Sequence, residues 1–378
     1  MVNCTKPYTP SVITKAPSYL VVEGVINTGS NDSTVIRLSR TVPLTAGAGI
    51  TPEQGAIITI QSDNNQTYAL HDAGNGIYMS DDLNLDNTHK YRLNINTSDG
   101  KNYVSDYLAS VSTPPIDSIG FTIKSNGLQI YANTHDPNNN THYYRWDYTE
   151  TWQFHSKYFS YYISNGTDMV PRDPSQFIYQ CWGNSISNDI ILGSSAKLTQ
   201  DVIYQNPITF IQSTSEKIET RYSILLKQYA LSAAGYNYFE QLRQNTEELG
   251  GIFDPQPTQL TGNVHCTTDA TIPAIGYVTA GTIQQKRIYI DNSELPKTDA
   301  WLTAYPYNCG QDTALYYNPK TKLNEVAEFL IPLPPALLAT QGWFGNPPAM
   351  NPIGYLYSDP ECVDCTLRGT VVKPSFWK

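Results

Sequence analysis

The chain has 378 residues, which is too long for one ordinary hydrophobic core and predicts two domains or three. Its formal charge is -10 and its 24 basic residues are scattered singly, which excludes the clustered basic face that nucleic acid requires. No stretch approaches the roughly 18–20 apolar residues of a membrane span. The 28 tyrosines greatly outnumber the 10 phenylalanines, and tyrosine suits a half-buried strand because its ring packs while its hydroxyl stays in water. This composition favours a β-rich, exported protein.

The N-terminal segment, residues 1–18, predicts a tether. Residues 5–17 contain three prolines and no hydrophobic periodicity. The residues before Cys4 lack the basic start and the apolar stretch of an export signal. Either the protein is cytoplasmic, or Cys4 stands at a mature N-terminus, as the lipidated cysteine of a bacterial lipoprotein does. The extended segment after Cys4 favours the second interpretation, with Cys4 as the lipidation site.

Short strands separated by turns follow over residues 19–112. Residues 34–40 and 90–95 alternate as half-buried strands do, and Asp99-Gly100 is a strong hairpin turn. About seven such strands at regular spacing are typical of a β-sandwich of the immunoglobulin or fibronectin kind. Thr113-Pro114-Pro115 breaks the pattern and marks the predicted domain boundary.

Residues 113–290 predict a second β-sandwich with one helix inserted at 232–249. Ser232 is a suitable N-cap and Gly250-Gly251 a suitable end for that helix. Residues 291–378 are rich in Pro, Gly, Tyr and Trp. We expect them to form a loop-rich, cysteine-containing extension that wraps over the second sandwich. The predicted fold class is therefore mainly β, with two sandwiches.

The cysteines either remain buried thiols or form one or two disulfides in an oxidising compartment. We expect Cys309 to pair with Cys362 or Cys365, and Cys181 to pair with Cys266. Five cysteines follow Cys4, so at least one thiol stays free in a monomer. Cys362-x-x-Cys365 resembles half a zinc site but has no second pair of ligands, so we expect neither a metal nor a cofactor.

An aromatic run between residues 143 and 162 supplies the candidate binding residues. Tyr144, Trp146 and Tyr148 share one strand face and are expected to fill the core. Beyond Glu150 the alternation is lost, which leaves two possibilities, further core or an exposed loop that stacks sugars or anchors a protein. The candidate binding residues are Trp152, Phe154, Tyr158 and Tyr161.

Signatures of catalysis are missing from the sequence. It contains no nucleophile elbow, zinc-protease motif, phosphate loop or dinucleotide fingerprint. Residues 136–140 place oxygens as a calcium loop would, but the sixth-position glycine is missing and a turn is favoured. His135, His142 and His155 lie near the aromatic run, where a site is conceivable. Glutamates that could form a glycosidase pair are too common to be evidence, so we expect a non-enzymatic protein.

Several separated stretches carry a family resemblance. They include Leu20-Val-Val-Glu-Gly24, Tyr143-Tyr-Arg-Trp146, Lys227-Gln-Tyr-Ala-Leu-Ser232 and Cys362-x-x-Cys365-Thr-Leu-Arg-Gly369. Together they resemble the outer-membrane lipoproteins of Bacteroidota grouped as domain of unknown function 4249. The resemblance implies a lipid-anchored surface or periplasm-facing protein, with genes that often neighbour those of TonB-dependent transporters. It implies no known enzymatic activity, and Cys4 lies where the lipidated cysteine of the family is expected.

The preferred hypothesis is a lipoprotein of the outer membrane, at the cell surface, that helps a TonB-dependent transporter to capture or gate a substrate. Only its N-terminal lipid would contact the membrane. One alternative is a carbohydrate-binding protein or glycoside hydrolase, and another is a structural adhesin. A binding protein predicts an aromatic-lined groove or a large exposed apolar patch.

Overall fold

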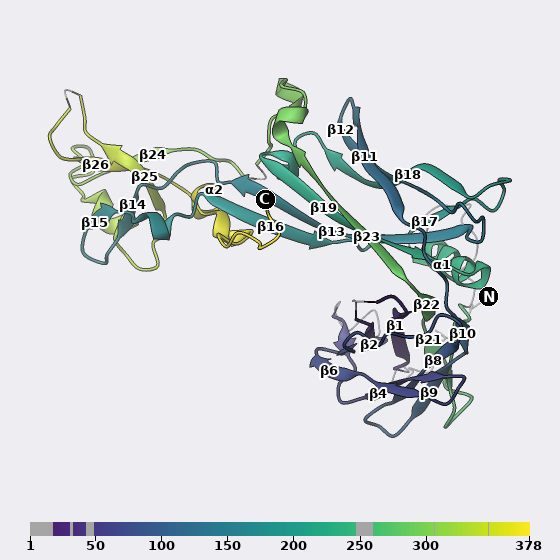
Figure 1. The fold of residues 1–378 in the computed structure, drawn as a ribbon. Helices are drawn as coiled ribbons and strands as arrows, with labels where there is room; N and C mark the ends of the chain where they lie inside the picture. The colour runs from purple at the N-terminus through teal and green to yellow at the C-terminus, as the bar shows by residue number, and fades with distance from the viewer. Residues whose placement is uncertain (1–17, 31–32, 43–48, 247–259, 306, 347) are drawn as a thin grey trace, which may run out of the picture.

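The computed structural model describes residues 18–30, 33–42, 49–246, 260–305, 307–346 and 348–378. The fold is mainly β, as predicted, and comprises two sandwiches and a smaller C-terminal module (Figure 1). The second sandwich lies between the other two bodies. Within the described ranges, no helix has the length and apolar character needed to cross a bilayer.

The first sandwich packs two sheets around one core. Its first sheet contains β1 (Leu20–Asn27), β2 (Val35–Arg40), β3 (Thr51–Pro52), β6 (His71–Gly74) and β7 (Ile77–Met79). Its second sheet contains β4 (Ile57–Ser62), β5 (Thr67–Ala69), β8 (Lys90–Asn96), β9 (Asn102–Ser105) and β10 (Leu108–Ala109). Alternate residues such as Val22 and Ile36 on one sheet meet Ile60 and Leu93 on the other. This alternation is the pattern that the sequence showed.

A later segment closes this sandwich, so the predicted division of the chain is wrong there. β20 (Val264–Cys266) pairs with β9, while β21 (Ala274–Ile275) and β22 (Thr279–Gly281) run parallel to β1. Val278 and Ala280 are buried in the first core. Residues 264–281 therefore belong to the first sandwich rather than to the second.

The second sandwich encloses the largest core. Its smaller sheet contains β11 (Ile116–Lys124), β12 (Gly127–His135) and β18 (Val202–Gln212). Its larger sheet contains β13 (Tyr143–His155), β16 (Gln180–Ile186), β17 (Ile191–Ser194), β19 (Arg221–Ala230) and β23 (Ile283–Asp291). Tyr144 and Trp146 are buried in this core, as expected, and the Trp146 indole donates to Gln228 Oε1 at 2.9 Å.

The helix α1 (Ala233–Thr246) begins where the sequence predicted. Ser232 Oγ accepts a hydrogen bond from the Gly235 amide at 3.1 Å, which caps the first turn. Tyr236 and Phe239 pack against a small cluster on the outer side of the larger sheet. The predicted helix end at Gly250-Gly251 lies outside the described residues.

The two sandwiches are joined by two chain crossings that bond to each other. The Val111 amide donates to Ala280 O at 3.0 Å, and the Thr282 amide donates to Val111 O at 3.1 Å. A Cβ at Gly281 would lie 2.3 Å from Val111 O, so only glycine allows this approach. Thr113 donates twice to Thr282, from its amide to the Thr282 hydroxyl and from its hydroxyl to Thr282 O. The crossings therefore hold the two sandwiches in one arrangement.

Residues 291–378 are more ordered than predicted, and much of this segment does not wrap the second sandwich. β24 (Asp312–Leu315), β25 (Leu338–Trp343) and β26 (Gly354–Ser358) form a sheet, and the hairpin β14 (Tyr162–Ser164) and β15 (Met169–Pro171) packs beside it. Together with the π-helical turn η6 (Val326–Leu330), they enclose a third core around Ala314, Leu330 and Tyr355. We call this unit the C-terminal module.

Residues before the C-terminal module, such as Leu295 and Trp301, pack on the second sandwich, and the final segment returns to it. The final segment contains α2 (Pro360–Val363) and η7 (Cys365–Leu367), and Trp182 N donates to Thr370 O at 2.8 Å. Trp377 is buried between Trp182 and Tyr289. The remaining short turns are η2 (Pro174–Gln176), η3 (Glu216–Ile218), η4 (Asn292–Glu294) and η5 (Asp299–Trp301).

Candidate functional site

Two disulfides tie the final segment, which follows the C-terminal module, to β16 of the second sandwich and to the residues that lead into the module. Cys309 bonds to Cys362, which is one of the two pairings expected for it. Cys181 bonds to Cys365 and not to Cys266, so that expected pairing is wrong. Cys266 is instead a buried free thiol of the first sandwich, near the Thr268 hydroxyl. Cys4 lies outside the described residues.

Two of the four candidate binding residues are part of the core. β13 continues to His155, so Trp152 and Phe154 stay on the inward face and are buried. The interpretation of these two residues as an exposed loop is therefore wrong. The strand continues because Glu150, which interrupts the apolar alternation, is also inward and is satisfied there. Its carboxylate accepts from Tyr222 Oη at 2.6 Å and from Lys217 Nζ.

The other two candidates lie at the seam between the second sandwich and the C-terminal module. Tyr158 is half-buried, and its hydroxyl donates to Cys309 O at 2.8 Å. Its amide donates to Cys362 O at 3.0 Å, so Tyr158 bridges both cysteines of one disulfide. Tyr161 is 54% exposed. Tyr158 thus positions the segment, and Tyr161 presents an accessible ring.

Tyr161 belongs to a cluster of rings that we call the aromatic surface. Its members are His155, Phe159, Tyr161, Phe177 and Tyr179. The Phe159 ring lies at its centre, with its centroid 4.5 Å from Tyr161, 4.9 Å from Phe177 and 5.1 Å from Tyr179. His155 stacks on Tyr179 at 4.8 Å, and Phe177 is 37% exposed. The cluster is therefore a contiguous, partly exposed apolar surface.

The backbone holds the aromatic surface in place from both sides. Tyr161 N donates to Thr340 O at 2.9 Å, and Arg172 N donates to Tyr161 O at 2.8 Å. Ser156 N donates to Tyr179 O at 2.8 Å. Asp173 caps the turn η2 that precedes Phe177. The rings are thus presented by fixed backbone and not by a free loop.

A polar group borders the aromatic surface. Glu219 accepts from the His155 amide at 2.9 Å and from Tyr305 Oη at 2.8 Å. Burial, followed by the charge of Glu219, raises the pKa of Tyr305 above its usual value, so this hydroxyl stays protonated and donates. Lys157 Nζ lies 5.4 Å from the centre of the Tyr305 ring. Rings beside a carboxylate and an ammonium group can stack on a ligand and hydrogen-bond to it.

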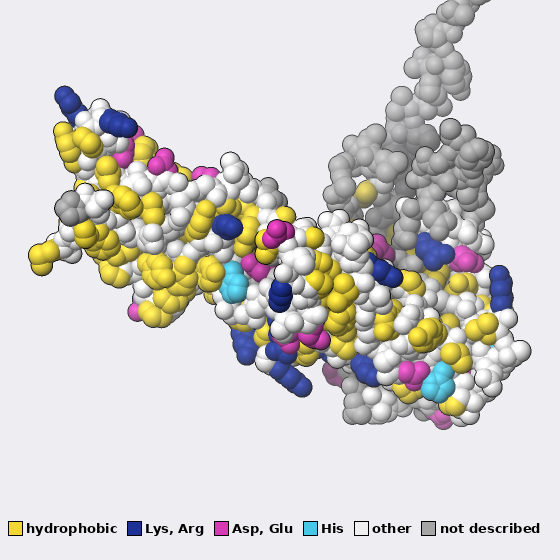
Figure 2. Space-filling model, turned by 90° about the horizontal axis from the view of Figure 1, so that it is seen from above, with side chains coloured by type: hydrophobic (Ala, Val, Ile, Leu, Met, Phe, Trp, Pro, Cys, Tyr) yellow, Lys and Arg dark blue, Asp and Glu magenta, His cyan; other side chains and the backbone are white. Residues whose placement is uncertain are grey.

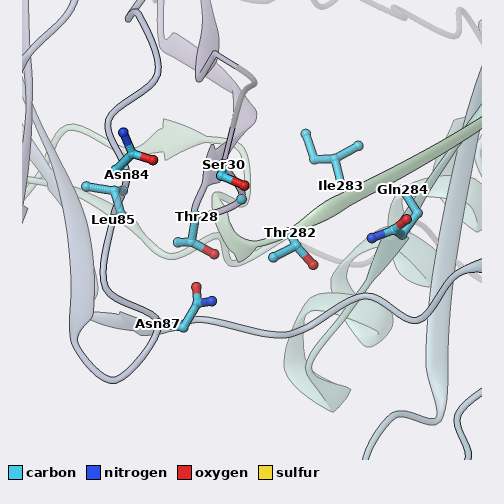
Figure 3. A pocket seen from close by; sticks show the side chains of 9 residues that line it. Thr28, Ser30, Asn84, Leu85, Asn87, Thr282, Ile283 and Gln284 are labelled. Carbon is cyan, nitrogen blue, oxygen red and sulfur yellow. The ribbon is translucent and has the colours of Figure 1, made fainter.

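A concave feature lies at the junction of the sandwiches. This cavity has a volume of about 460 Å³, and its side chains are mostly hydroxyls and amides (Figure 3). Its lining residues are Thr28, Gly29, Ser30, Asn84, Leu85, Asn87, Thr282, Ile283 and Gln284. Thr28 and Asn87 already bond to Ser110, at 2.7 and 3.0 Å. Much of its polarity therefore serves the junction itself.

The loop considered for calcium folds as a turn. The Asp136 carboxylate accepts from the amides of Asn138, Asn140 and Thr141, at 2.8–3.0 Å. These bonds lower the pKa of Asp136, against the opposing effect of burial. Within the described ranges, no cluster of three or more His, Cys, Asp or Glu side chains is arranged to hold a metal.

The histidines near the aromatic run are separated by the fold. His135 bonds to Asp117 on the surface, His155 joins the aromatic surface, and His142 Nδ1 lies 3.1 Å from Ser195 Oγ. Ser195 donates in turn to Asp201 and is fully buried. The serine therefore lies between the histidine and the aspartate, where it cannot act as the exposed nucleophile of a triad.

Phe159 lies within the predicted aromatic run but was not among the four candidate binding residues, and sequence reasoning missed Phe177 and Tyr179. Phe177 and Tyr179 lie beyond the β14–β15 hairpin, which brings them back beside Phe159. Their spacing in the sequence, Phe-x-Tyr, contains no local signal for this contact.

The fold and site define a disulfide-linked β-sandwich protein with an exposed aromatic surface. A family model described as "Domain of unknown function (DUF4249)" matches residues 5–287, and the chain belongs to this family. No curated protein matches the chain. A solved structure described as "Biofilm associated protein - B domain" shares 10% identity over 72% of this chain and 85% of its own. Its TM-score is 0.11, too low to support any likeness of fold.

Proposed function

We propose that this protein is a non-catalytic surface lipoprotein that captures a ligand on behalf of a TonB-dependent outer-membrane transporter. The aromatic surface is the observation that carries the capture role. Partly exposed rings held by fixed backbone give large contact area at a low cost in conformational entropy. The family implies the lipid anchor and the neighbouring transporter.

The carboxylates near Trp152 support binding over glycoside hydrolysis. Both oxygens of Glu150 are engaged, and its side chain is only 3% exposed. Glu216 is paired with Arg368 at 3.2 Å and accepts from the Trp152 indole at 3.4 Å. Neither carboxylate is free to protonate a leaving group or to activate water.

Glycans are the class of ligand that we expect the aromatic surface to bind. Sugar rings stack on aromatic faces, and the rim of Glu219, Lys157 and Tyr305 supplies polar partners beside those faces. An array of glycans tests this with the wild type, with Tyr161→Ala/Phe177→Ala and with Tyr204→Ala as the control. Tyr204 is an exposed tyrosine on β18, outside the aromatic surface. If Tyr161→Ala/Phe177→Ala binds glycans as the wild type does, the aromatic surface is not the site that captures the ligand.

The accessory role needs a separate experiment. The natively expressed, tagged precursor is extracted in mild detergent, and the proteins that co-purify are identified by mass spectrometry. We expect a TonB-dependent barrel in stoichiometric amount. Recovery of the protein alone would reject the accessory role and leave a free-standing binder.

The anchor is tested by Cys4→Ser in the full-length precursor. Without the acylated thiol the protein should move to the soluble fraction, because a lipid chain contributes about 0.8 kcal/mol of membrane affinity per buried methylene. Retention of the Cys4→Ser protein in the outer membrane would contradict lipid anchoring through this residue.

A further inference from the structure

Exposed apolar side chains gather at one end of the C-terminal module. Seven of the large hydrophobic side chains that are exposed among the described residues lie between residues 317 and 353. Figure 2 shows hydrophobic side chains gathered over this end of the molecule, at the left of the view. Figure 1 places β24–β26 at the end farthest from the first sandwich.

Strand pairing brings these side chains together. Leu315 at the end of β24 and Trp343 at the end of β25 both pair with Gly354 at the start of β26. Ile353 N donates to Trp343 O at 2.8 Å, and Tyr316 N donates to Ile353 O at 3.0 Å. The exposed side chains that follow these strand ends form what we call the apolar tip. Its members are Tyr317, Trp343, Phe344, Met350 and Ile353.

The composition of the apolar tip is that of a membrane-interface contact. Met350 is 100% exposed, an arrangement that costs free energy in water unless another phase covers it. Trp343 and Tyr317 combine a ring with a polar group, as residues at the headgroup level of a bilayer do. The turn closed by Lys322 N on Asn318 O directly follows Tyr317 and presents Lys320 and Lys322.

The charges near the apolar tip agree with a lipid surface. The side chains of Lys320 and Lys322 are exposed and form no ion pair with any residue that the structure describes. The nearby Glu325 is occupied internally, where it accepts from Leu315 N at 3.2 Å and from Asn318 Nδ2. The lysines are therefore available to lipid phosphates, which attract basic side chains next to an inserted segment.

We propose that the apolar tip inserts into the headgroup region of a lipid bilayer, which would make it a second membrane contact in addition to the N-terminal lipid expected from the sequence. Met350 enters deepest, Trp343 and Tyr317 lie at the headgroups, and the lysines contact phosphate. A lipid surface fits this projecting end better than a protein does. A stable protein interface requires roughly 800 Å² from each partner and a complementary shape, whereas membrane insertion requires only apolar side chains that can leave water.

Vesicle flotation tests the proposal with the full chain carrying no lipid anchor. The vesicles contain phosphatidylcholine, with or without phosphatidylglycerol as the anionic lipid. We expect the wild type to float with vesicles and to bind more tightly when the anionic lipid is present. Trp343→Ser/Met350→Ser should weaken binding at least about tenfold, because both side chains lose their transfer from water to lipid. Ile57→Ser, at an aliphatic residue of the first sandwich that is 67% exposed, is the control and should bind as the wild type does.

A second measurement locates the contact. Brominated lipids should quench part of the tryptophan emission in the wild type, and Trp343→Phe should keep vesicle binding but lose this quenching. Two outcomes would overturn the proposal: a wild type that does not float with either vesicle, as expected if the tip docks on a protein, and equal binding of wild type and Trp343→Ser/Met350→Ser. The proposed ligand capture is tested separately at Tyr161 and Phe177, so the two ideas fail independently.

Discussion

Removal of the Cys309–Cys362 disulfide should loosen the C-terminal module selectively. This bond closes a loop of 53 residues. Loop-closure entropy for that length gives about 4 kcal/mol of stabilisation through the unfolded state. The module has only a small core, so this contribution is a large share of its local stability. The Cys309→Ser/Cys362→Ser protein should therefore open the module far more often than the wild type does.

Hydrogen exchange measures that opening. Since each 1.4 kcal/mol changes an equilibrium tenfold, exchange of the β26 amides should accelerate by up to about a thousandfold. Amides of β1 and β8 in the first sandwich should not change, because neither disulfide touches that core. A global unfolding midpoint is a poorer assay, since several bodies need not unfold in one step.

Unchanged β26 exchange in the Cys309→Ser/Cys362→Ser protein would refute the reasoning. It would mean that the module is held by its packing and not by the covalent tie. Thiol titration in denaturant provides the check on the bonds themselves. The two disulfides predict four more titratable thiols with reductant than without it.

Three further predictions concern single contacts. Gly281→Ala places a Cβ 2.3 Å from Val111 O and should cost about 3 kcal/mol in thermal unfolding, whereas Gly310→Ala, with open space around it, should be nearly neutral. Glu150→Gln should lower the free energy of unfolding by about 3 kcal/mol, because the Lys217 charge loses its partner. Adding Lys217→Met should restore much of that free energy in denaturant unfolding, because neither charge then remains. The pKa of Asp99 is lowered from 3.8 to about 2 by its bonds to Lys101 and Thr97, so its stabilisation is present above about pH 4 and is lost as the pH falls towards 2. The difference in stability between wild type and Asp99→Asn, under about 1 kcal/mol for so exposed a group, should shrink over that window and vanish below pH 2, and a difference of unchanged size at pH 2 would contradict this account.

The strands were predictable where alternation is local, and β13 shows where such reasoning stops. The alternation of Tyr144, Trp146 and Tyr148 predicts a buried strand face, and the charged Glu150 suggests that this face ends there. The structure continues the same face through Trp152 and Phe154. A carboxylate is tolerated there because Lys217 and Tyr222, 67 and 72 residues away in the sequence, reach it. Periodicity cannot reveal partners at that distance.

The predicted division into domains was incomplete for a related reason. Thr113-Pro114-Pro115 does lie between the two sandwiches, but the chain crosses back and places β20–β22 on the first. These strands are only two or three residues long. Short strands that pair with distant partners carry almost no signal of their own. The contact between Phe159 and Phe177 was hidden in the same way, because the β14–β15 hairpin separates the two residues in the sequence and only the folded chain brings their rings together.

Each body of this protein is completed by a segment from elsewhere in the chain, and the aromatic surface lies on one such exchange. The segment between β13 and β16 leaves the second sandwich, contributes β14–β15 to the C-terminal module, and returns. A ligand on Tyr161 and Phe177 would therefore rest on both bodies. Tyr158 bonds that segment to Cys309 and Cys362. The relative position of the second sandwich and the C-terminal module at the aromatic surface is therefore fixed before a ligand binds. Affinity should then depend on the disulfide even though no cysteine touches the ligand, since loosening the seam adds the entropy of ordering the rings to the cost of binding.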